Sequence, residues 1–513
     1  MPDLAIKPSE DMARQGGTLR VKGFSEFFEP RLDPALGDWI FICQQIFDGL
    51  VRLDSDLNIV PALAEYWNVR EDGKKYIFYL RKGVRFHNGQ EMTSQDVKFS
   101  LERLLRKETN SPYYQFFLTR VAGAQEFREG KADEVSGFRA PNKHIFEILW
   151  RNPYVSALSL LSMSFCKILP KDLVLSAGKN FFWKPTGTGA FKFGYWLRSP
   201  RLDIVGVRLE RNNDYFGRKA YLEAFEFSPF YTIDHFLSKE VEIMPFLSDS
   251  LANAGCQVME GGPFNITFLM MSCLTPPLDR IRIRKALSYG IDKEKLARAI
   301  FGQEYVRRTT NNFIPAKLPG FFPLDDQVSY DLSRARQILR EEGYSPEKKF
   351  PDLLVFIESP KNDINYKFFR ELERQFGEMG ITLSPRYYKN FNELRNVGRP
   401  YLARLEWIMD IPEPENIIQP LFSSLSPFSL IVNQYGNPRL DQLLDESDVE
   451  RSWTRRIDLF RRMEQILMED VPAVPLFYDE QRVALQPYVR GAKIPALGFY
   501  YMDVRDVWLD KKE

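Results

Sequence analysis

The sequence predicts an α/β protein with more than one domain, and three observations support this prediction. The chain has 513 residues, more than one hydrophobic core usually holds, so we expect two or three domains. Its composition, 44% hydrophobic and 27% charged, is that of an ordinary globular protein. An apolar strand at 353–357, an amphipathic helix through Met379 and a strand from Ile381 follow one another, which predicts a parallel βαβ unit buried on both faces.

The stretch from 75 to 105 has the clearest local pattern. Residues 75–80 alternate, with Tyr76, Phe78 and Leu80 on the face that we expect to be buried. Thr93 precedes Asp96 by three residues, which is the spacing of a helix capping box, and apolar residues follow at helical intervals. These signals predict a strand, a turn and a helix in that order.

Other segments carry weaker signals of the same kinds. Asp331 is expected to cap a helix that Gly343 closes. The glycines of 187–189 lack the pattern of a phosphate-binding loop, and we interpret them as tight-turn residues before a strand. The remaining expected elements are strands at 16–21, 191–196, 204–211, 222–227, 265–271 and 474–478, helices around 40–50 and 283–291, and a helical hairpin at 438–468.

Basic residues lie just before the helix at 283–291 and in its first turn. They are Arg280, Arg282, Arg284 and Lys285, and we interpret them as a solvated basic face. The whole chain has 70 basic and 69 acidic residues, a balance that gives no support for a nucleic-acid partner. No apolar run reaches the roughly 18 residues that a transmembrane helix needs.

The sequence contains no motif of an enzyme or a metal centre. Its three histidines, His87, His144 and His235, lie far apart and form neither HExxH nor a Cys-His cluster, and GxSxG is absent. We therefore expect no catalytic activity, no cofactor and no metal site. His87 lies in a turn-rich segment, where a structural hydrogen-bonding role is the simpler interpretation.

The four cysteines are widely spaced and form no CxxC pair, which argues against a zinc site. One alternative, for an exported protein, is a bond between Cys256 and Cys273 across a short loop, and the simpler alternative is free buried thiols. The sequence alone leaves both open.

A set of short fragments at particular spacings resembles one known family. The fragments are Gly49-Leu50-Val51, Pro61-Ala62-Leu63-Ala64, Trp67, Phe86, Asn88-Gly89, Asp96-Val97, Phe99-Ser100, the run Pro185 to Phe191, and Arg282 to Leu287 followed by Gly290-Ile291-Asp292. Together they resemble the peptide and nickel class, family 5, of ABC-transporter extracellular solute-binding proteins. The resemblance covers most of the chain.

The resemblance implies a two-lobed periplasmic-binding-protein fold of type II, cluster C, with an extra inserted subdomain. It places the core of lobe I at 14–47, 183–262 and 478–513, the inserted subdomain at 48–182 and lobe II at 263–477. Segments near 260–275 and 470–480 are then expected to act as hinges. It also implies a periplasmic or extracellular, membrane-associated location. The N-terminus has no secretion signal, so we expect the printed chain to begin after a removed one.

The segment 403–416 is the most informative candidate site. In peptide-binding relatives an aspartate three residues after a tryptophan receives the ligand's α-ammonium, and Trp407 and Asp410 have this spacing. The alternative role for Asp410 is to cap the following helix. Pro412 and Pro414 stop the strand, which places Asp410 where a strand end opens into a loop.

Four further residues are candidates by the same resemblance. Arg404 and Arg395 match positions where some oligopeptide binders have arginines that face the ligand's carboxylate or nearby acidic groups, and surface ion pairing is the alternative for both. Glu413 is a second possible anchor or a structural acid. Tyr113, in a Ser-Pro-Tyr sequence, is either a wall of the site or a packing residue in an aromatic cluster.

The sequence departs from the common pattern at Glu406, where relatives often have a small residue, and at Glu413-Pro414-Glu415, where Asp-Pro-Asp is frequent. These departures bear on ligand identity rather than on fold. The expected function is capture of a short peptide and its delivery to an ABC permease by a monomeric protein. Alternatives are a nonpeptide ligand such as a nickel chelate, haem, an opine or an oligosaccharide, a ligand-sensing module of a transcriptional regulator, and, more distantly, a hydrolase.

Overall fold

A computed structural model describes most of the chain. The described residues are 15–23, 29–37, 39–261, 265–302, 308–316, 318, 321–323, 329–358, 363–388, 390–395, 397–409, 411–478 and 481–511, without the side chains of Asp249 and Arg308. The chain forms two compact units, unit 1 (Met1–Gly262 with Gln481–Glu513) and unit 2 (Pro263–Glu480). A separate inserted subdomain at 48–182 remains a prediction.

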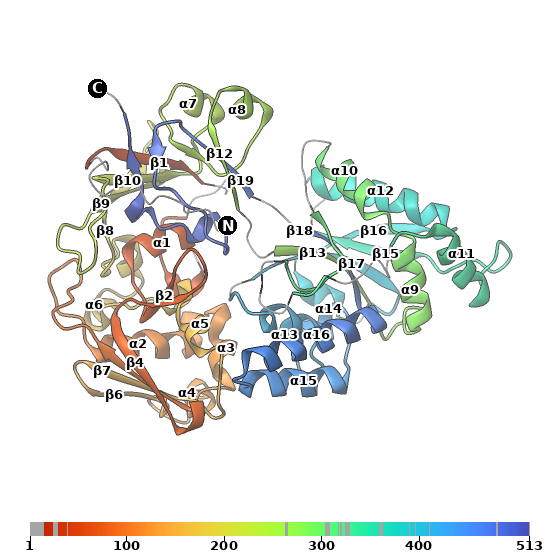
Figure 1. Ribbon diagram of the computed structural model, residues 1–513, viewed down its shortest axis with the longest axis horizontal. Helices are drawn as coiled ribbons and strands as arrows, with labels where there is room; N and C mark the ends of the chain where they lie inside the picture. Colours follow the sequence, from red (N-terminus) through yellow and green to blue (C-terminus); the bar gives the residue numbers. More distant parts are fainter. Residues whose placement is uncertain are drawn as a thin grey trace. The chain divides into compact units, whose positions relative to one another are not determined.

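Unit 1 contains a seven-stranded sheet (Figure 1). Its order is β12 (Gln257–Gly261), β19 (Gln481–Leu485), β11 (Ile243–Met244), β1 (Thr18–Lys22), β10 (Ala224–Ser228), β9 (Ile204–Arg211) and β8 (Phe191–Arg198). Helix α1 (Ile40–Ile46) packs on this sheet, because the ring of Phe41 meets that of Phe225 edge-on at 5.3 Å. Strand β19, which lies between β12 and β11, comes from the C-terminal part of the chain.

The second sheet of unit 1 has four strands in the order β4 (Ala64–Arg70), β5 (Lys75–Leu80), β7 (Ile145–Leu149) and β6 (Phe138–Asn142). Tyr76, Phe78 and Leu80 are buried, as the alternation predicts. Helix α2 (Ser94–Leu105) starts with the predicted capping box, in which the Thr93 N–H donates to Asp96 Oδ2 at 2.8 Å. The predicted strand, turn and helix are therefore confirmed.

Unit 1 also has six short helices and four short strands. They are α3 (Gln115–Leu118), α4 (Ala124–Arg128), α5 (Ala157–Leu161), α6 (Lys171–Ala177), α7 (Ile233–Leu237), α8 (Asp249–Asn253), β2 (Val51–Leu53), β3 (Ile59–Pro61), β20 (Val489–Arg490) and β21 (Trp508–Leu509).

The segment 187–189 lies in close contact with the backbone of helix α1. A Cβ atom added to Gly187 would lie 2.0 Å from the carbonyl oxygen of Ile46, and one added to Gly189 would lie 2.3 Å from that of Gln45. Neither glycine has a positive φ, so these residues are needed for close approach to α1 and not for a tight turn. His87 fixes the same segment, because its Nδ1 accepts the Gly187 N–H at 3.2 Å and its Nε2 bonds the Gly189 carbonyl at 3.0 Å. The predicted structural role of His87 is confirmed.

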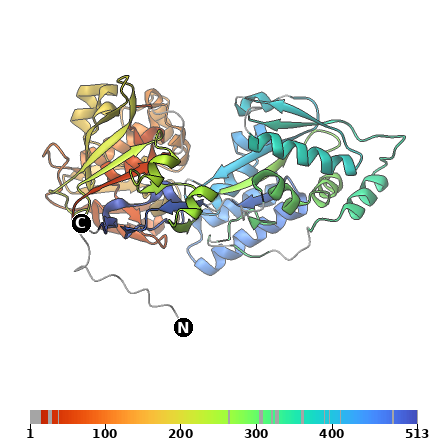
Figure 2. The same ribbon diagram turned by 90° about the horizontal axis from the view of Figure 1, so that it is seen from above.

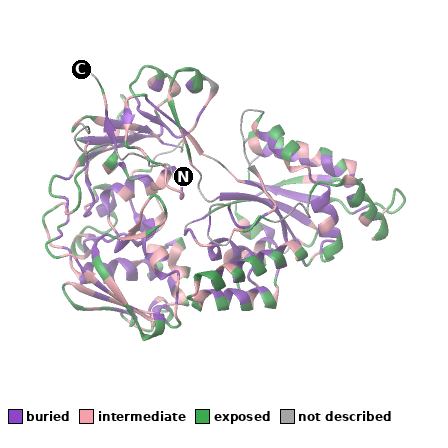
Figure 3. Ribbon diagram, in the orientation of Figure 1, coloured by how far each residue is buried: buried purple, intermediate pink, exposed green. Residues whose placement is uncertain are grey.

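Unit 2 is built on a six-stranded sheet. Its order is β14 (Arg308–Thr309), β18 (Ala473–Tyr478), β13 (Asn265–Met271), β17 (Tyr401–Ile408), β15 (Leu353–Ile357) and β16 (Leu383–Tyr387). Strands β13 and β15 are buried along their whole length (Figure 3). The pair β15 and β16 is parallel, as predicted. Burial on both faces is wrong for β16, since this edge strand is exposed from Pro385 to Tyr387.

Helices cover both faces of this sheet. Figures 1 and 2 show α10 and α12 over one face and α13 to α16 over the other. The helices are α9 (Ile281–Tyr289), α10 (Lys293–Phe301), α11 (Leu332–Glu341), α12 (Asp363–Glu378), α13 (Glu415–Phe422), α14 (Pro427–Val432), α15 (Pro438–Val449) and α16 (Trp453–Asp470). The predicted cap is confirmed, because Asp331 Oδ1 accepts the Arg334 N–H at 2.8 Å.

The basic face predicted at the start of α9 is wrong at one residue. Arg280 and Arg282 are exposed and pair with Glu342, in agreement with a solvated face. Arg284 is only 4% exposed and donates to the backbone carbonyls of Asp470 and Leu278, at 2.9 and 2.8 Å from its Nε and Nη1. Its guanidinium therefore joins α9 to the end of α16.

The four cysteines have free thiols, so the alternative of a bond between Cys256 and Cys273 does not hold in this structure. Cys256 is partly exposed and the other three are buried.

Candidate ligand-binding site

Strand β17 carries the central part of the candidate site in unit 2. Because side chains alternate along a strand, Arg404 and Glu406 share one face and Leu405 and Trp407 share the other. The pairing of β17 with β13 places Asn265 next to this end of the strand, where its Nδ2 donates to Glu406 Oε1 at 3.1 Å. One face of β17 therefore carries the charged pair Arg404 and Glu406, and the other carries Leu405 and Trp407.

The guanidinium of Arg404 is buried but only partly paired. The residue is 9% exposed, and its Nη1 donates to Asn365 Oδ1 of α12 at 3.3 Å. Its Nη2 lies 3.8 Å from Glu406 Oε2, and the ring of Phe368 lies 5.6 Å from the guanidinium carbon. The Arg404 Nε–H donates to no acceptor among the described residues.

A second unsatisfied polar atom belongs to Tyr388, whose hydroxyl is buried without a hydrogen-bond partner in the part of the chain that is described. Burial raises the pKa of Tyr388, the Glu358 carboxylate raises it further, and the Arg404 guanidinium opposes this. Buried polar atoms in native proteins nearly always have partners. The Arg404 face of β17 therefore has buried donors that have no partner among the described residues.

This face can bind both signs of charge. Arginine offers a planar fork of N–H donors that matches a carboxylate, and Arg404 has not used all of them. The Glu406 side chain is 36% exposed and can accept hydrogen bonds from an ammonium group. A positive and a negative group 3.8 Å apart suit a zwitterionic ligand better than a neutral one.

Trp407 lies on the other face and has structural partners. Its Nε1 donates to the carbonyl of Asn416 at 2.9 Å, and its ring packs against Phe428 at 5.7 Å. Asn416 opens α13, and its Oδ1 accepts the Ile411 N–H at 3.5 Å. Trp407 thus fixes the loop between β17 and α13, and a ligand contact for it remains a prediction.

Asp410, the predicted ammonium anchor, lies outside the described residues. Its neighbours Met409 and Ile411 are buried. On the C-terminal side, Glu413 and Glu415 bind the same guanidinium, that of Arg456 on α16, at 2.7 and 3.3 Å. Arg456 is 2% exposed, so this ion pair anchors the loop inside unit 2.

The buried ion pair with Arg456 gives Glu413 a structural role. Removing one member of such a buried pair leaves an uncompensated charge, which is strongly unfavourable. Its role as an alternative ligand anchor remains a prediction.

The two other candidates lie elsewhere in the fold. Arg395 follows a 3-10 helix (Phe391–Leu394) and is exposed. Tyr113 belongs to unit 1, where its ring stacks on that of Phe165 with centroids 4.1 Å apart and an interplanar angle of 13°. Tyr113 keeps partial exposure, which is compatible with either of its two predicted roles.

Sequence reasoning missed the partners that complete this environment: Asn265, Asn365, Tyr388, Asn416 and Arg456. A signal existed for one of them. Asn365 precedes Phe368, Phe369 and Leu372 at helical spacing, so it is a polar residue on the apolar face of α12. The others come together only through the tertiary fold.

Two negative findings concern the described residues alone. They contain no group of three or more His, Cys, Asp or Glu side chains arranged to hold a metal ion. No helix among them combines the length and apolar character needed to cross a membrane.

Comparison with known proteins shows which family the chain belongs to. The model of the bacterial extracellular solute-binding proteins, family 5 Middle, matches residues 58–427. The chain belongs to this family, and the predicted two-lobed α/β fold is confirmed. Members of the family are periplasmic or extracellular solute-binding proteins.

Particular relatives differ in what their names say they bind. The chain is 23% identical over 510 residues to the dipeptide-binding protein of Escherichia coli (strain K12), which covers 94% of this chain and 92% of that protein. It is 25% identical over 482 residues to heme-binding protein A of Haemophilus influenzae, covering 87% and 84%. A solved structure of DppA from Helicobacter pylori in complex with the peptide STSA has a TM-score of 0.78 at 23% identity, covering 97% and 99%. At this identity the likeness shows the fold.

Proposed function

We propose that this protein captures short peptides outside the cytoplasm and delivers them to an ABC permease. The observation that carries the proposal is the Arg404 and Glu406 pair on β17, because its unused donor and acceptor capacity suits the charged ends of a peptide. Relatives that are named as dipeptide-binding and oligopeptide-binding proteins support the same ligand class.

The protein is proposed to act by binding and not by catalysis. In peptide-binding proteins, main-chain groups of an extended ligand pair with strand-like backbone, while charged side chains hold its ends. The chain passes between the units at Gly262 and Pro263 and again at Glu480 and Gln481. We propose that the segments at 260–275 and 470–480 are the hinges for ligand-dependent closure.

The first experiment identifies the ligand. Native mass spectrometry of protein purified without added ligand should detect bound peptides, and a defined mixture of dipeptides to pentapeptides should add matching masses. Recovery of intact peptides after incubation would exclude hydrolysis. Retention of haem or another nonpeptide solute, with no peptide bound, would overturn the peptide proposal.

The second experiment tests Arg404. Arg404→Gln should weaken binding of the retained peptide by about 10- to 100-fold, because a hydrogen bond to a charged group contributes about 1.5–3 kcal/mol. Amidation of the peptide's carboxyl terminus should produce a similar loss in the parent and little further loss in the variant. Arg439→Gln, an exposed arginine of α15, is the matched control. Equal calorimetric affinities of Arg404→Gln and the parent would contradict this role.

The third experiment tests the ammonium anchor. Asp410→Asn should reduce the preference for a free over an N-acetylated peptide, whereas Asp445→Asn, an exposed change in α15, should leave that preference unchanged. If Asp410→Asn retains the parent's preference in calorimetry, the ammonium role of Asp410 is wrong.

A further inference from the structure

Unit 1 contains a cavity of about 580 Å³ that none of the predicted peptide-site residues lines. Binding pockets for small molecules typically have about 300–1,000 Å³, so the volume is sufficient for a small organic ligand. Its wall includes Asp48 and Gly49 after α1, the β2–β3 hairpin, Tyr215 after β9 and the C-terminal residues Met502 and Asp503. All of these belong to unit 1.

Two carboxylates of the cavity wall, those of Asp48 and Asp503, already have partners. Asp48 Oδ1 accepts the Tyr215 hydroxyl at 3.2 Å, and its Oδ2 accepts the Thr188 hydroxyl at 3.1 Å. Asp503 pairs with the guanidinium of Arg505, whose Nε donates to Asp503 Oδ2 at 2.7 Å. Burial alone would raise the pKa of Asp503, but the Arg505 guanidinium holds that pKa below its usual value.

Two other carboxylates of the wall, those of Asp54 and Asp506, also have partners. Asp54 Oδ2 accepts the Asn58 Nδ2–H at 3.1 Å, and Asp54 Oδ1 accepts the Asn58 backbone N–H at 2.9 Å. Asp506 pairs with Arg218. Each of these four acidic residues of the wall therefore already has a hydrogen-bond or ion-pair partner within the protein.

Two basic residues of the wall, Lys167 and Arg52, have no such partner among the described residues. Lys167 is 6% exposed, and its ammonium makes no hydrogen bond or ion pair with any residue that the structure describes. Arg52 is half-buried, and its guanidinium likewise has no such partner among the described residues. Both act electrostatically on Asp503, which places them around the same part of the cavity.

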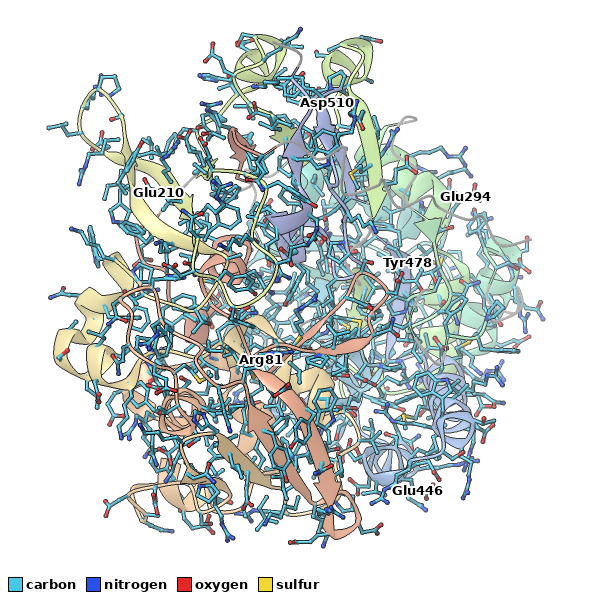
Figure 4. All side chains as sticks on the ribbon, turned by 60° about the vertical axis from the view of Figure 1, so that its left-hand side comes forward. Arg81, Glu210, Glu294, Glu446, Tyr478 and Asp510 are labelled. Atoms are coloured by element: carbon cyan, nitrogen blue, oxygen red, sulfur yellow. The ribbon has the colours of Figure 1, made fainter. Side chains whose placement is uncertain are left out.

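A buried ammonium without a hydrogen-bond acceptor is unusual, because desolvation of the charge is costly unless a partner compensates. Burial lowers the pKa of Lys167, although Asp48 and Asp503 oppose this effect. Arg81, which follows β5 and is labelled in Figure 4, adds another guanidinium to the wall, and its Nε donates to the carbonyl of Ala62 at 2.8 Å. The groups left available in the cavity are therefore cationic.

We propose that this cavity of unit 1 binds a small organic anion whose carboxylate or phosphate oxygens pair with Lys167 and Arg52. Lysine provides a point charge with three donors and arginine a planar fork, and both suit an oxyanion. The inference goes beyond the proposed peptide capture, since it uses residues of unit 1 only.

Calorimetry on the full chain at low ionic strength tests this site with succinate and inorganic phosphate, and with neutral succinamide as the uncharged control. At least one anion should bind and succinamide should not. Binding of succinate without phosphate would assign a carboxylate ligand, and the reverse would assign a phosphate ligand. Absence of binding by both anions would overturn the proposal.

Variants locate the binding. Lys167→Met and Arg52→Gln should each weaken anion binding by about 10- to 100-fold, the loss expected for one charge-assisted hydrogen bond. Lys184→Gln, an exposed lysine of unit 1 outside the wall, should have no effect. Arg404→Gln should also leave anion binding unchanged, which separates this site from the proposed peptide site. Equal binding by the parent and both cavity variants would refute the assignment.

Thermal unfolding adds a readout that a purely structural lysine would not give. Because Lys167 has no partner to lose, Lys167→Met should unfold at the same temperature as the parent or higher without anion. At one anion concentration, the unfolding temperature of the parent should rise more than that of Lys167→Met, because the variant binds the anion more weakly. If Lys167→Met unfolds at a much lower temperature, Lys167 has a structural role, and Arg52→Gln then decides whether the anion site exists.

Discussion

Glu464 of α16 should make unit 2 less stable as the pH rises from 4.5 to about 7. Its Oε1 accepts the backbone N–H groups of Phe313 and Ile314 at 2.6 and 2.9 Å. Burial of the carboxyl raises the pKa of Glu464 from 4.5 to about 7. The folded state therefore retains a proton that the unfolded state releases between these two pH values.

The sign and size of the effect follow from proton linkage. Where the folded state binds more protons than the unfolded state, the free energy of unfolding falls as pH rises. The stabilisation is full below pH 4.5 and is lost as pH rises to about 7. At 1.36 kcal/mol per pKa unit, the loss is about 3 kcal/mol.

The variant Glu464→Gln isolates this effect, because glutamine has the shape of the protonated acid and cannot ionise. Its free energy of unfolding should match the parent's near pH 4 and exceed it by about 3 kcal/mol near pH 8. Guanidinium chloride unfolding across this range measures the difference, with the transition of unit 2 treated separately if the two units unfold apart. Glu469→Gln, an exposed change on the same helix, is the control. A difference between Glu464→Gln and the parent that does not change with pH would refute the reasoning.

Three further changes have expected outcomes in the same unfolding assay. Burial lowers the pKa of His87 to about 4, so the advantage of the parent over His87→Gln should shrink by about 3 kcal/mol as pH falls from 6.5 to 4; a constant advantage would contradict this. Gly189→Ala should cost about 1–3 kcal/mol or more, because its Cβ would lie 2.3 Å from the Gln45 carbonyl oxygen, and a neutral result would show that the backbone yields. Arg284→Met should cost at least about 1–3 kcal/mol by leaving buried carbonyls without donors, whereas Arg282→Met should cost less than about 0.5 kcal/mol; equal costs would contradict the buried role.

Elements with complete local signals could be predicted from the sequence. The capping box of Thr93 and Asp96 and the cap at Asp331 are satisfied within three residues, so no distant part of the chain is needed to specify them. The parallel pairing of β15 and β16 followed from the order strand, helix, strand.

Features that depend on distant residues could not be predicted. An apolar strand pattern does not tell whether a strand lies at the edge of a sheet, which is why the exposure of β16 was missed. Arg284 looked like its exposed neighbours, because its carbonyl partners at Asp470 and Val471 are more than 180 residues away in the chain. The contact of Asn365 with Arg404 was missed for the same reason, because Asn365 lies on helix α12 and Arg404 on strand β17.

The candidate site itself was predicted as one contiguous motif, and the geometry of a strand divides it. Arg404 and Trp407 are three residues apart, so a period of two places them on opposite faces of β17. Trp407 then holds the loop through Asn416, while Arg404 shares its face with Glu406. Glu406, which departs from the residue common in relatives, is thus the residue beside the unused donors of Arg404. A change at this position alters the charge available to a ligand without altering the fold, so ligand preference in this chain should depend on Glu406 more than on Trp407.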